Sequence, residues 1–336
     1  MINRRTLLKT AAIGATQAVA LPFVAREGFG QTPAHTLKLT MADTRNHPLY
    51  QVLLRFADSV KTKTNGAVEV KVYGVGELGS QLNILTGLQT GIIDLCAHTS
   101  GFIDTLFPQF QVMDLPFLFP DVTSAEKVLD GPIGKQLANL MPTKGIYALT
   151  YGHWGWRVTS TIDRKLPEPQ DMKGMKIRVQ PGPIFAAMYR ALGANPIAID
   201  FSEIYLALSQ RTIEAIETPI ISLPAAKHYE VVKVINLTNH VYKAGVLMVS
   251  KRKFDSMAKN LQDGLRDAAI EMTPDWRKTM LDKTTETTAF LKGKGLSFID
   301  VDRAAYRKET HGVYAEFRPI IGAELYDAVL KQVDKG

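Results

Sequence analysis

The chain has 336 residues, of which 46% are hydrophobic and 22% are charged, and its formal net charge is +7. These values indicate a globular protein long enough for two domains, and they exclude a disordered or collagen-like chain. No run of basic residues points to nucleic acid as a partner. The single cysteine, Cys96, excludes an internal disulfide, and its apolar neighbours predict a buried strand residue rather than a nucleophile.

The N-terminus has the pattern of an export signal. Arg4 and Arg5 precede an apolar, uncharged stretch at residues 11–25, the order of a secretory signal with a twin-arginine n-region. The stretch is too short for a membrane span, which needs about 20 apolar residues. We expect residues 1–34 to be a signal peptide and the mature protein to work outside the cytoplasm. Residues 18–20 and 32–34 both have the small residues of a cleavage site. Removal of residues 1–30 leaves 36 basic and 32 acidic residues, a net charge of +4, which suits an anionic ligand.

Strand and helix patterns alternate along the first half of the mature chain. Apolar residues at every second position predict strands, and apolar residues spaced by three and four predict helices. The predicted order is a strand at 37–41, a helix at 49–60, a strand at 68–72, a helix at 81–89 and a strand at 92–97. This β-α-β-α-β order is typical of a parallel sheet covered by helices.

The alternation continues to the C-terminal part. A capping box at residues 123–126 predicts a helix that begins at Thr123 and runs to Leu129. Further strands are predicted at 146–150, 156–160, 176–179, 197–199, 213–216 and 245–250, and further helices at 184–192 and 203–209. A helical stripe covers residues 261–291, and Pro274 inside it is expected to kink or split that helix. No linker divides the chain, so two domains would have to share strands or helices.

The chain lacks the usual signatures of an enzyme. The glycines at residues 74–79 match a dinucleotide fingerprint, but they follow the second predicted strand rather than the first, and an ordinary glycine-rich turn explains them as well. The seven histidines are scattered along the sequence and predict no metal site. We therefore expect a protein that is not an enzyme and needs no cofactor or metal.

Two arginines on apolar strands are the best candidates for ligand binding. Arg157 and Arg178 each interrupt an apolar run, and a buried guanidinium needs an anion or other acceptors. Its planar fork matches a carboxylate. The alternative is that each arginine reaches water or pairs with a carboxylate of the protein itself, and the pattern alone does not decide between the two.

Several blocks of the sequence resemble a known family. Residues 171–180, Asp-Met-Lys-Gly-Met-Lys-Ile-Arg-Val-Gln, are similar to a block of the extracytoplasmic solute receptors of tripartite ATP-independent periplasmic (TRAP) transporters, the DctP type. Further similar blocks, in the same order as in that family, are Gly87–Asp94, Leu115–Phe119, Gly155–Arg157, Leu192–Pro196, Glu203–Leu208 and Thr238–His240. The resemblance covers nearly the whole mature chain.

The resemblance implies the periplasmic-binding-protein, or venus-flytrap, fold: two α/β domains joined by hinge strands and a long bridging helix. It implies a first domain at residues 35–154 plus 243–280 and a second at 155–242 plus 281–336. It also implies a monomeric receptor that captures a small organic acid and delivers it to the small and large TRAP membrane subunits. An exported enzyme and a sensory receptor of the same fold are the alternatives.

The resemblance also implies which residues bind the acid. Arg178 would grip the carboxylate in a bidentate pair, with Arg157 assisting it. The further ligand contacts that we expect are Phe201, Thr218, Trp156, His47, His98 and Ser100. Thr218 stands where the family usually has asparagine, and this departure favours a less hydroxylated, more apolar acid.

Overall fold

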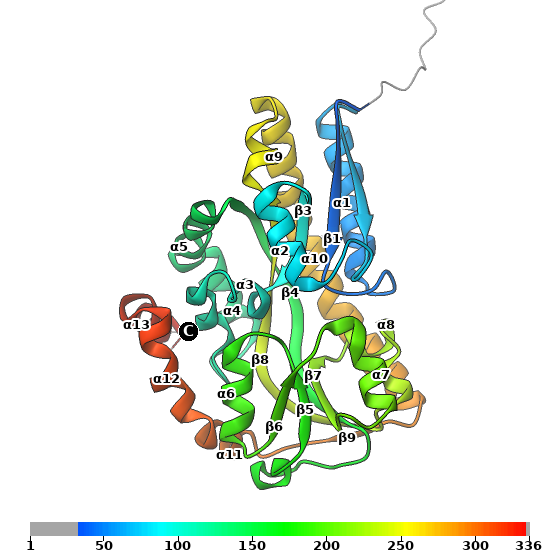
Figure 1. Ribbon diagram of the computed structural model, residues 1–336, viewed down its shortest axis with the longest axis vertical. Coiled ribbons are helices and arrows are strands. Elements are labelled where there is room, and N and C mark those ends of the chain that lie inside the picture. Colours follow the sequence, from blue (N-terminus) through cyan, green and yellow to red (C-terminus); the bar gives the residue numbers. More distant parts are fainter. Residues whose placement is uncertain (1–32, 334–336) are drawn as a thin grey trace, which may run out of the picture. The chain divides into compact units, whose positions relative to one another are not determined.

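The computed structural model describes residues 33–333. The predicted signal peptide falls almost entirely outside these residues. Within them, no helix is long and apolar enough to cross a membrane. All the strands join one nine-stranded sheet in the order β2-β1-β3-β8-β4-β7-β5-β6, with β9 paired to β8, and helices pack around it (Figure 1). The chain thus has the mixed α/β fold expected from the alternating patterns.

The first part of the sheet is parallel, as predicted. It contains β1 (His35–Met41), β2 (Val68–Tyr73) and β3 (Leu95–Thr99), connected through α1 (Leu49–Lys63) and α2 (Gln81–Thr90). The apolar stripe of α1 is buried against the sheet, and the left-handed Asn65 and Gly66 turn the chain into β2. The third strand starts three residues later than predicted, because the left-handed Gly91 ends α2 and a short turn follows.

Two long antiparallel strands run through the middle of the sheet. They are β4 (Ile146–Thr161) and β8 (Val234–Ser250), and Figure 1 shows them side by side. The predictions of separate strands at 146–150 and 156–160 and of a short strand at 245–250 were wrong. The glycine-containing segment between the first two remains in the ladder, since Gly155 has a positive φ of 110° and the pairing adapts through irregularities in register.

The second part of the sheet continues from β4. It contains β7 (Ala215–Pro219), β5 (Lys176–Val179) and β6 (Asn195–Ala198), with β9 (Ser297–Ile299) at β8. The helices of this part are α6 (Pro183–Ala191), α7 (Ile204–Ser209) and α8 (Ser222–Ala225). Strand β7 pairs with both β4 and β5, so its side chains lie between Arg157 and Arg178.

The remaining helices pack around these strands. They are α3 (Ser100–Ile103), α4 (Val122–Asp130), α5 (Pro132–Leu140), α9 (Lys251–Asp255), α11 (Arg303–Glu309), α12 (His311–Ile321) and α13 (Ala323–Val333). Short 3-10 helices are η1 (Pro108–Asp114), η2 (Met141–Lys144), η3 (Pro169–Met172), η4 (Phe201–Glu203) and η5 (His228–Glu230). The expected start of α4 at Thr123 was wrong: Asp121 caps this helix, because its carboxylate accepts the Ser124 N–H at 2.7 Å.

The long helix α10 (Lys259–Gly293) packs against α1 and β4. It continues through Pro274 without a split, because Pro274 lies on the exposed side, where water can reach the carbonyl that its missing N–H leaves free. Trp276, fully buried, lies against Gly152 of β4 and Gly245 of β8, which are partners in the ladder. A Cβ added at Gly152 would come within 2.1 Å of the indole, so α10 contacts the central strands where they have no side chains.

Candidate ligand-binding site

Residues from both parts of the sheet line a small cavity beside the central strands. The lining residues are Ala42, Asp43, Gln81, Thr99, Trp154, Arg157, Arg178, Gln180, Phe201, Thr218, Pro219 and Ser222. Several of them follow directly on the carboxyl ends of strands, where α/β sheets usually place their ligand sites. The enclosed space is only about 20 Å³, because polar groups of the two parts bond to each other across the cavity. The structure therefore shows a closed cleft.

Arg178 on β5 has unused hydrogen-bonding capacity at this cavity. Its side chain is 1% exposed, and its Nε donates to the Ile199 carbonyl at 2.9 Å. Its Nη2 is buried and has no partner within residues 33–333. Burial lowers the pKa of Arg178 to about 10, although the nearby Glu217 opposes the shift, so the group is a cation at neutral pH. A buried donor without an acceptor is costly, and a carboxylate would satisfy it.

Arg157 on β4 is bound by a carboxylate of the protein. Its Nε donates to the Glu217 carboxylate and its Nη2 to the Glu217 carbonyl, and both side chains are almost completely buried. Burial alone would raise the pKa of Glu217, but Arg157 and His240 hold it at about 2, so the pair is ionised. The second Glu217 oxygen accepts the Gln180 N–H at 3.1 Å. Arg157 lines the cavity, but its charge is already compensated.

A carboxylate, Asp43, faces the same cavity from the loop after β1. Its Oδ1 accepts the Thr44 N–H at 2.9 Å, and its Oδ2 accepts the Ser222 hydroxyl at 2.6 Å. Burial raises the pKa of Asp43 to about 7, although Ser222, Thr44 and Trp154 act as donors and oppose the shift. Asp43 and Ser222 come from opposite parts of the sheet, so their hydrogen bond crosses the cleft.

Two amides at the cavity are only half satisfied. The Gln180 amide nitrogen donates to the Thr99 hydroxyl at 3.1 Å, and the Gln81 amide nitrogen lies 3.2 Å from His98 Nε2. The opposite end of each amide is buried without a partner in the described part of the chain. Each glutamine therefore keeps one polar atom available for a further hydrogen bond.

The structure brings together four of the eight residues expected to contact ligand: Arg178, Arg157, Thr218 and Phe201 line the cavity. His98 lies just behind it, against Gln81 and stacked on the Phe102 ring.

The other three expected residues lie elsewhere. His47 is buried against Trp154, with its Nε2 3.7 Å from Asp43, and Trp156 stands edge-on to Tyr242. Trp154, rather than Trp156, lines the cavity. Ser100 belongs to a separate buried cluster.

That cluster holds a second buried cation near the cavity. Lys243 Nζ lies 3.1 Å from Asp114 Oδ1, and the Ser100 hydroxyl donates to the same oxygen at 2.8 Å. Asp104 is also buried there, and burial raises its pKa to about 8. The Lys243 charge is thus compensated inside the protein.

Sequence reasoning missed most of the polar lining. Asp43 and Gln180 each follow within two residues of a strand end, a position that could have singled them out. Ser222 and Gln81 stand at the starts of helices and have no motif of their own. Glu217 is recognisable only once β7 is known to lie between the two arginine strands.

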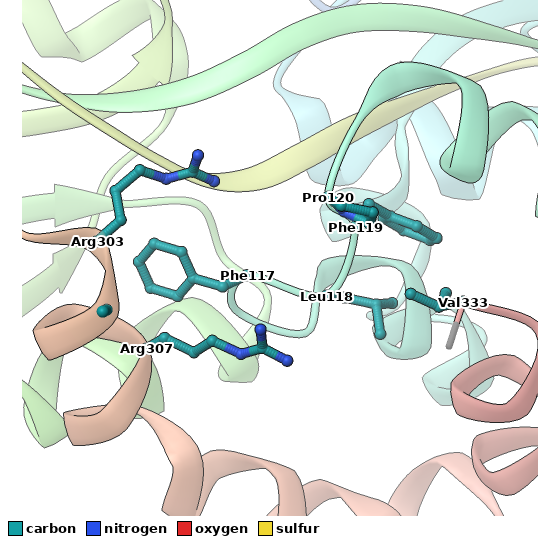
Figure 2. A pocket seen from close by; sticks show the side chains of 8 residues that line it. Phe117, Leu118, Phe119, Pro120, Arg303, Arg307 and Val333 are labelled. Carbon is teal, nitrogen blue, oxygen red and sulfur yellow. The ribbon is translucent and has the colours of Figure 1, made fainter. Parts of the chain in front are cut away.

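A larger hollow of about 440 Å³ lies elsewhere, beside α11 (Figure 2). Arg303 and Arg307 lie on either side of the Phe117 ring, with Arg303 6.0 Å from the ring centroid. Both arginines are exposed, so water screens their charges and an anion would gain little there. The small cavity has the buried, unsatisfied Arg178 donor, and no such atom belongs to the described residues that line the hollow.

Comparison with known proteins decides the family. The sequence pattern of bacterial extracellular solute-binding protein, family 7 (DctP), matches residues 39–319. The chain belongs to this family. It is 30% identical over 322 residues to the 2,3-diketo-L-gulonate-binding periplasmic protein YiaO of Escherichia coli K12, covering 96% of this chain and 95% of that one. It is 29% identical over 337 residues, 98% of each chain, to the C4-dicarboxylate-binding periplasmic protein DctP of Rhodobacter capsulatus.

A solved structure agrees with this assignment. The sugar acid binding protein DctPAm of Advenella mimigardefordensis, in complex with galactonate, superimposes with a TM-score of 0.87 at 28% identity, over 89% of this chain and 98% of that chain. The resemblance noted from the sequence blocks and the expected two-domain periplasmic-binding-protein fold are thereby confirmed. The protein is a TRAP-type periplasmic solute-binding protein, a class that binds small organic acids for membrane transport subunits.

Proposed function

We propose that this protein captures a small organic acid through Arg178 and delivers it to the small and large TRAP membrane subunits for uptake. The observation that carries the proposal is that Arg178, a lining residue of the cavity, has a buried Nη2 without an acceptor in the described part of the chain. Thr218 and Phe201 would contact the rest of the acid. Glu217 fixes the Arg157 side chain, so the guanidinium group of Arg157 would lie beside the bound acid.

Binding and release of the acid would involve opening and closing of the cleft. Two domains, at residues 35–154 plus 243–280 and at 155–242 plus 281–336, open and close about β4 and β8, with α10 bracing both strands. A cavity of about 20 Å³ is too small for an organic acid, so the ligand enters an open form. The receptor works as a monomer without cofactor or catalysis, after export by the twin-arginine route.

Substitution of Arg178 tests the proposal. Arg178→Ala removes the partner of the anion, and loss of one side of a buried charge pair costs about 2–5 kcal/mol, on the order of thirtyfold to several thousandfold in Kd. Arg178→Lys keeps the charge without the fork, so it should recover part of the affinity. The measurement is calorimetric titration of galactonate and other organic acids into the mature protein.

Arg190→Ala is the matched control, because Arg190 is an exposed arginine on α6. It should bind like the wild type, and circular dichroism should show that all the variants are folded. If Arg178→Ala binds within about threefold of the wild type, which is about 0.7 kcal/mol, Arg178 is not the carboxylate clamp.

A further inference from the structure

The charges around the cavity limit how many carboxylates it can hold. Three charged side chains line it: Arg178, Arg157 and Asp43. Arg157 is neutralised by Glu217 in direct contact. Arg178 is therefore the one cation in the lining whose charge has no carboxylate bound to it in the described structure, and it can pair with a single carboxylate.

Among residues 33–333, no other group near the cavity can serve as a second cation. Lys243 is fully buried and paired with Asp114. Burial lowers the pKa of His98, His228 and His47 to about 3, so these imidazoles carry no charge at neutral pH. A second carboxylate in the closed cleft would have lost its water without gaining a counter-charge, which is costly.

Asp43 adds direct repulsion in its ionised form. It lies in the loop after β1, whereas Arg178 lies on β5, so the two groups face the cavity from different parts of the chain. The bonds from Ser222 and Thr44 hold the Asp43 carboxylate in place. Burial raises the pKa of Asp43 to about 7, so this carboxylate carries its full charge only above neutral pH. There, a ligand with a carboxylate at each end would bring its second carboxylate towards a group of the same charge.

Neutral polar groups supply the rest of the lining. The free amide ends of Gln81 and Gln180 are buried, and Thr218 lines the same cavity with its hydroxyl-bearing side chain. A hydroxyl group both donates and accepts, so it can satisfy either end of an amide, whichever way the amide is turned. Ligand hydroxyls would satisfy these atoms, whereas an apolar chain would leave them unpaired.

We propose that the cleft selects a hydroxylated monocarboxylate over dicarboxylates, and that Asp43 is the residue that sets this choice. The inference rests on the proposed function and specifies the ligand class of the same site. The sequence favoured a more apolar acid, because Thr218 replaces an asparagine. The two glutamine amides and Asp43 supply more polar contacts than this one replacement removes, so a hydroxylated acid fits the cavity better.

Matched pairs of acids test this selection. Galactonate and galactarate share one hydroxylated skeleton and differ in the second carboxylate, as do erythronate and meso-tartrate, and butyrate is the unhydroxylated acid of the shorter pair. Calorimetric titration of the mature protein at about pH 8.5, where Asp43 is ionised, should show binding of at least one of the two hydroxylated monocarboxylates. Its dicarboxylate partner should bind at least about tenfold more weakly.

In the Asp43→Asn variant, the Kd values of the two members of a pair should lie within about threefold of each other, because the substitution removes the charge and keeps the shape of the side chain. Asp58→Asn is the matched control, since it makes the same change at an exposed residue of α1 outside the cavity, so discrimination should persist. Equal affinity of the wild type for both members of a pair would overturn the inference while leaving a carboxylate receptor in place. Butyrate binding as tightly as erythronate would overturn the hydroxyl requirement, and no binding of any acid would overturn the proposed function as well.

Discussion

Arg157 and Arg178 show how one residue type takes two roles in one sheet. Both lie on strands that pair with β7, and both are almost completely buried. Glu217 of β7 bonds to Arg157, and Arg178 keeps a free nitrogen at the cavity. Of the two explanations that the sequence left open, an internal carboxylate thus accounts for Arg157. Arg178 Nη2 has no such partner in the described residues, so a carboxylate of a ligand remains the explanation for Arg178.

Asp43 gives a prediction about stability and pH. Its pKa in the folded protein is about 7, above the ordinary value of 3.8, so the folded state binds its proton more tightly than the unfolded state does. Its contribution to stability is complete below about pH 4 and is lost as the pH rises through about 7. The groups that face it are Ser222, Thr44, Trp154, the neutral His47 and, across the cavity, the two arginines.

The side chain at position 43 cannot titrate in the Asp43→Asn variant. The melting temperature of the wild type should therefore fall relative to that of this variant as the pH rises from 4 to 8. Thermal unfolding of both ligand-free proteins at constant ionic strength measures the difference. A difference that stays constant or grows in favour of the wild type over this range would contradict the assigned shift.

At the scale of elements, the packing of α10 on the central strands depends on glycines. Gly152→Ala would place a methyl group within 2.1 Å of the Trp276 ring, and neither the indole nor the ladder has room to move. Overpacking of this kind costs about 1–3 kcal/mol, and a lower denaturant midpoint in urea unfolding would show it.

Gly293→Ala is the matched control, because Gly293 lies in the last turn of the same helix and nothing stands within 4 Å of an added Cβ. It should leave stability unchanged or raise it by up to about 1 kcal/mol. If both variants unfold at the wild-type midpoint, Trp276 does not pack tightly against the glycine pair.

The elements also show what the sequence could reveal. Local periodicity predicted the positions of most strands and helices, because each buries one face and so repeats its apolar residues. It divided β4 at its glycines, since the pairing that keeps Gly155 in the strand comes from β8, far away in the chain. The polar lining was hidden for the same reason: Asp43 meets Ser222 across 179 residues of sequence.

For the whole molecule, the hydrogen bonds across the cleft describe a closed form. They join Asp43 to Ser222, Gln180 to Thr99, Thr44 to the Ala225 carbonyl and the Gln81 N–H to Asp200. Because the enclosed cavity is so small, we expect the ligand-free protein in solution to spend time in a more open form. Ligand would then shift the population towards a closed form whose cavity is wide enough to hold the acid.

Small-angle X-ray scattering of the mature protein should therefore give a smaller radius of gyration when a bound acid is present at saturation. Arg178→Ala at the same acid concentration should keep the ligand-free radius. A wild-type radius that does not change on saturation would argue against closure about β4 and β8.

The three tryptophans of the chain all lie on β4 or on the helix α10 that packs against it. Trp154 lines the cavity and stands edge-on to Trp276, with ring centroids 5.9 Å apart, while Trp156 follows two residues later on β4. Indole fluorescence responds to nearby water and polar groups, and no tryptophan elsewhere adds a constant background. The unlabelled protein thus carries its own optical probe, and its emission can follow the arrival of a solute in a stopped-flow mixer without any attached dye.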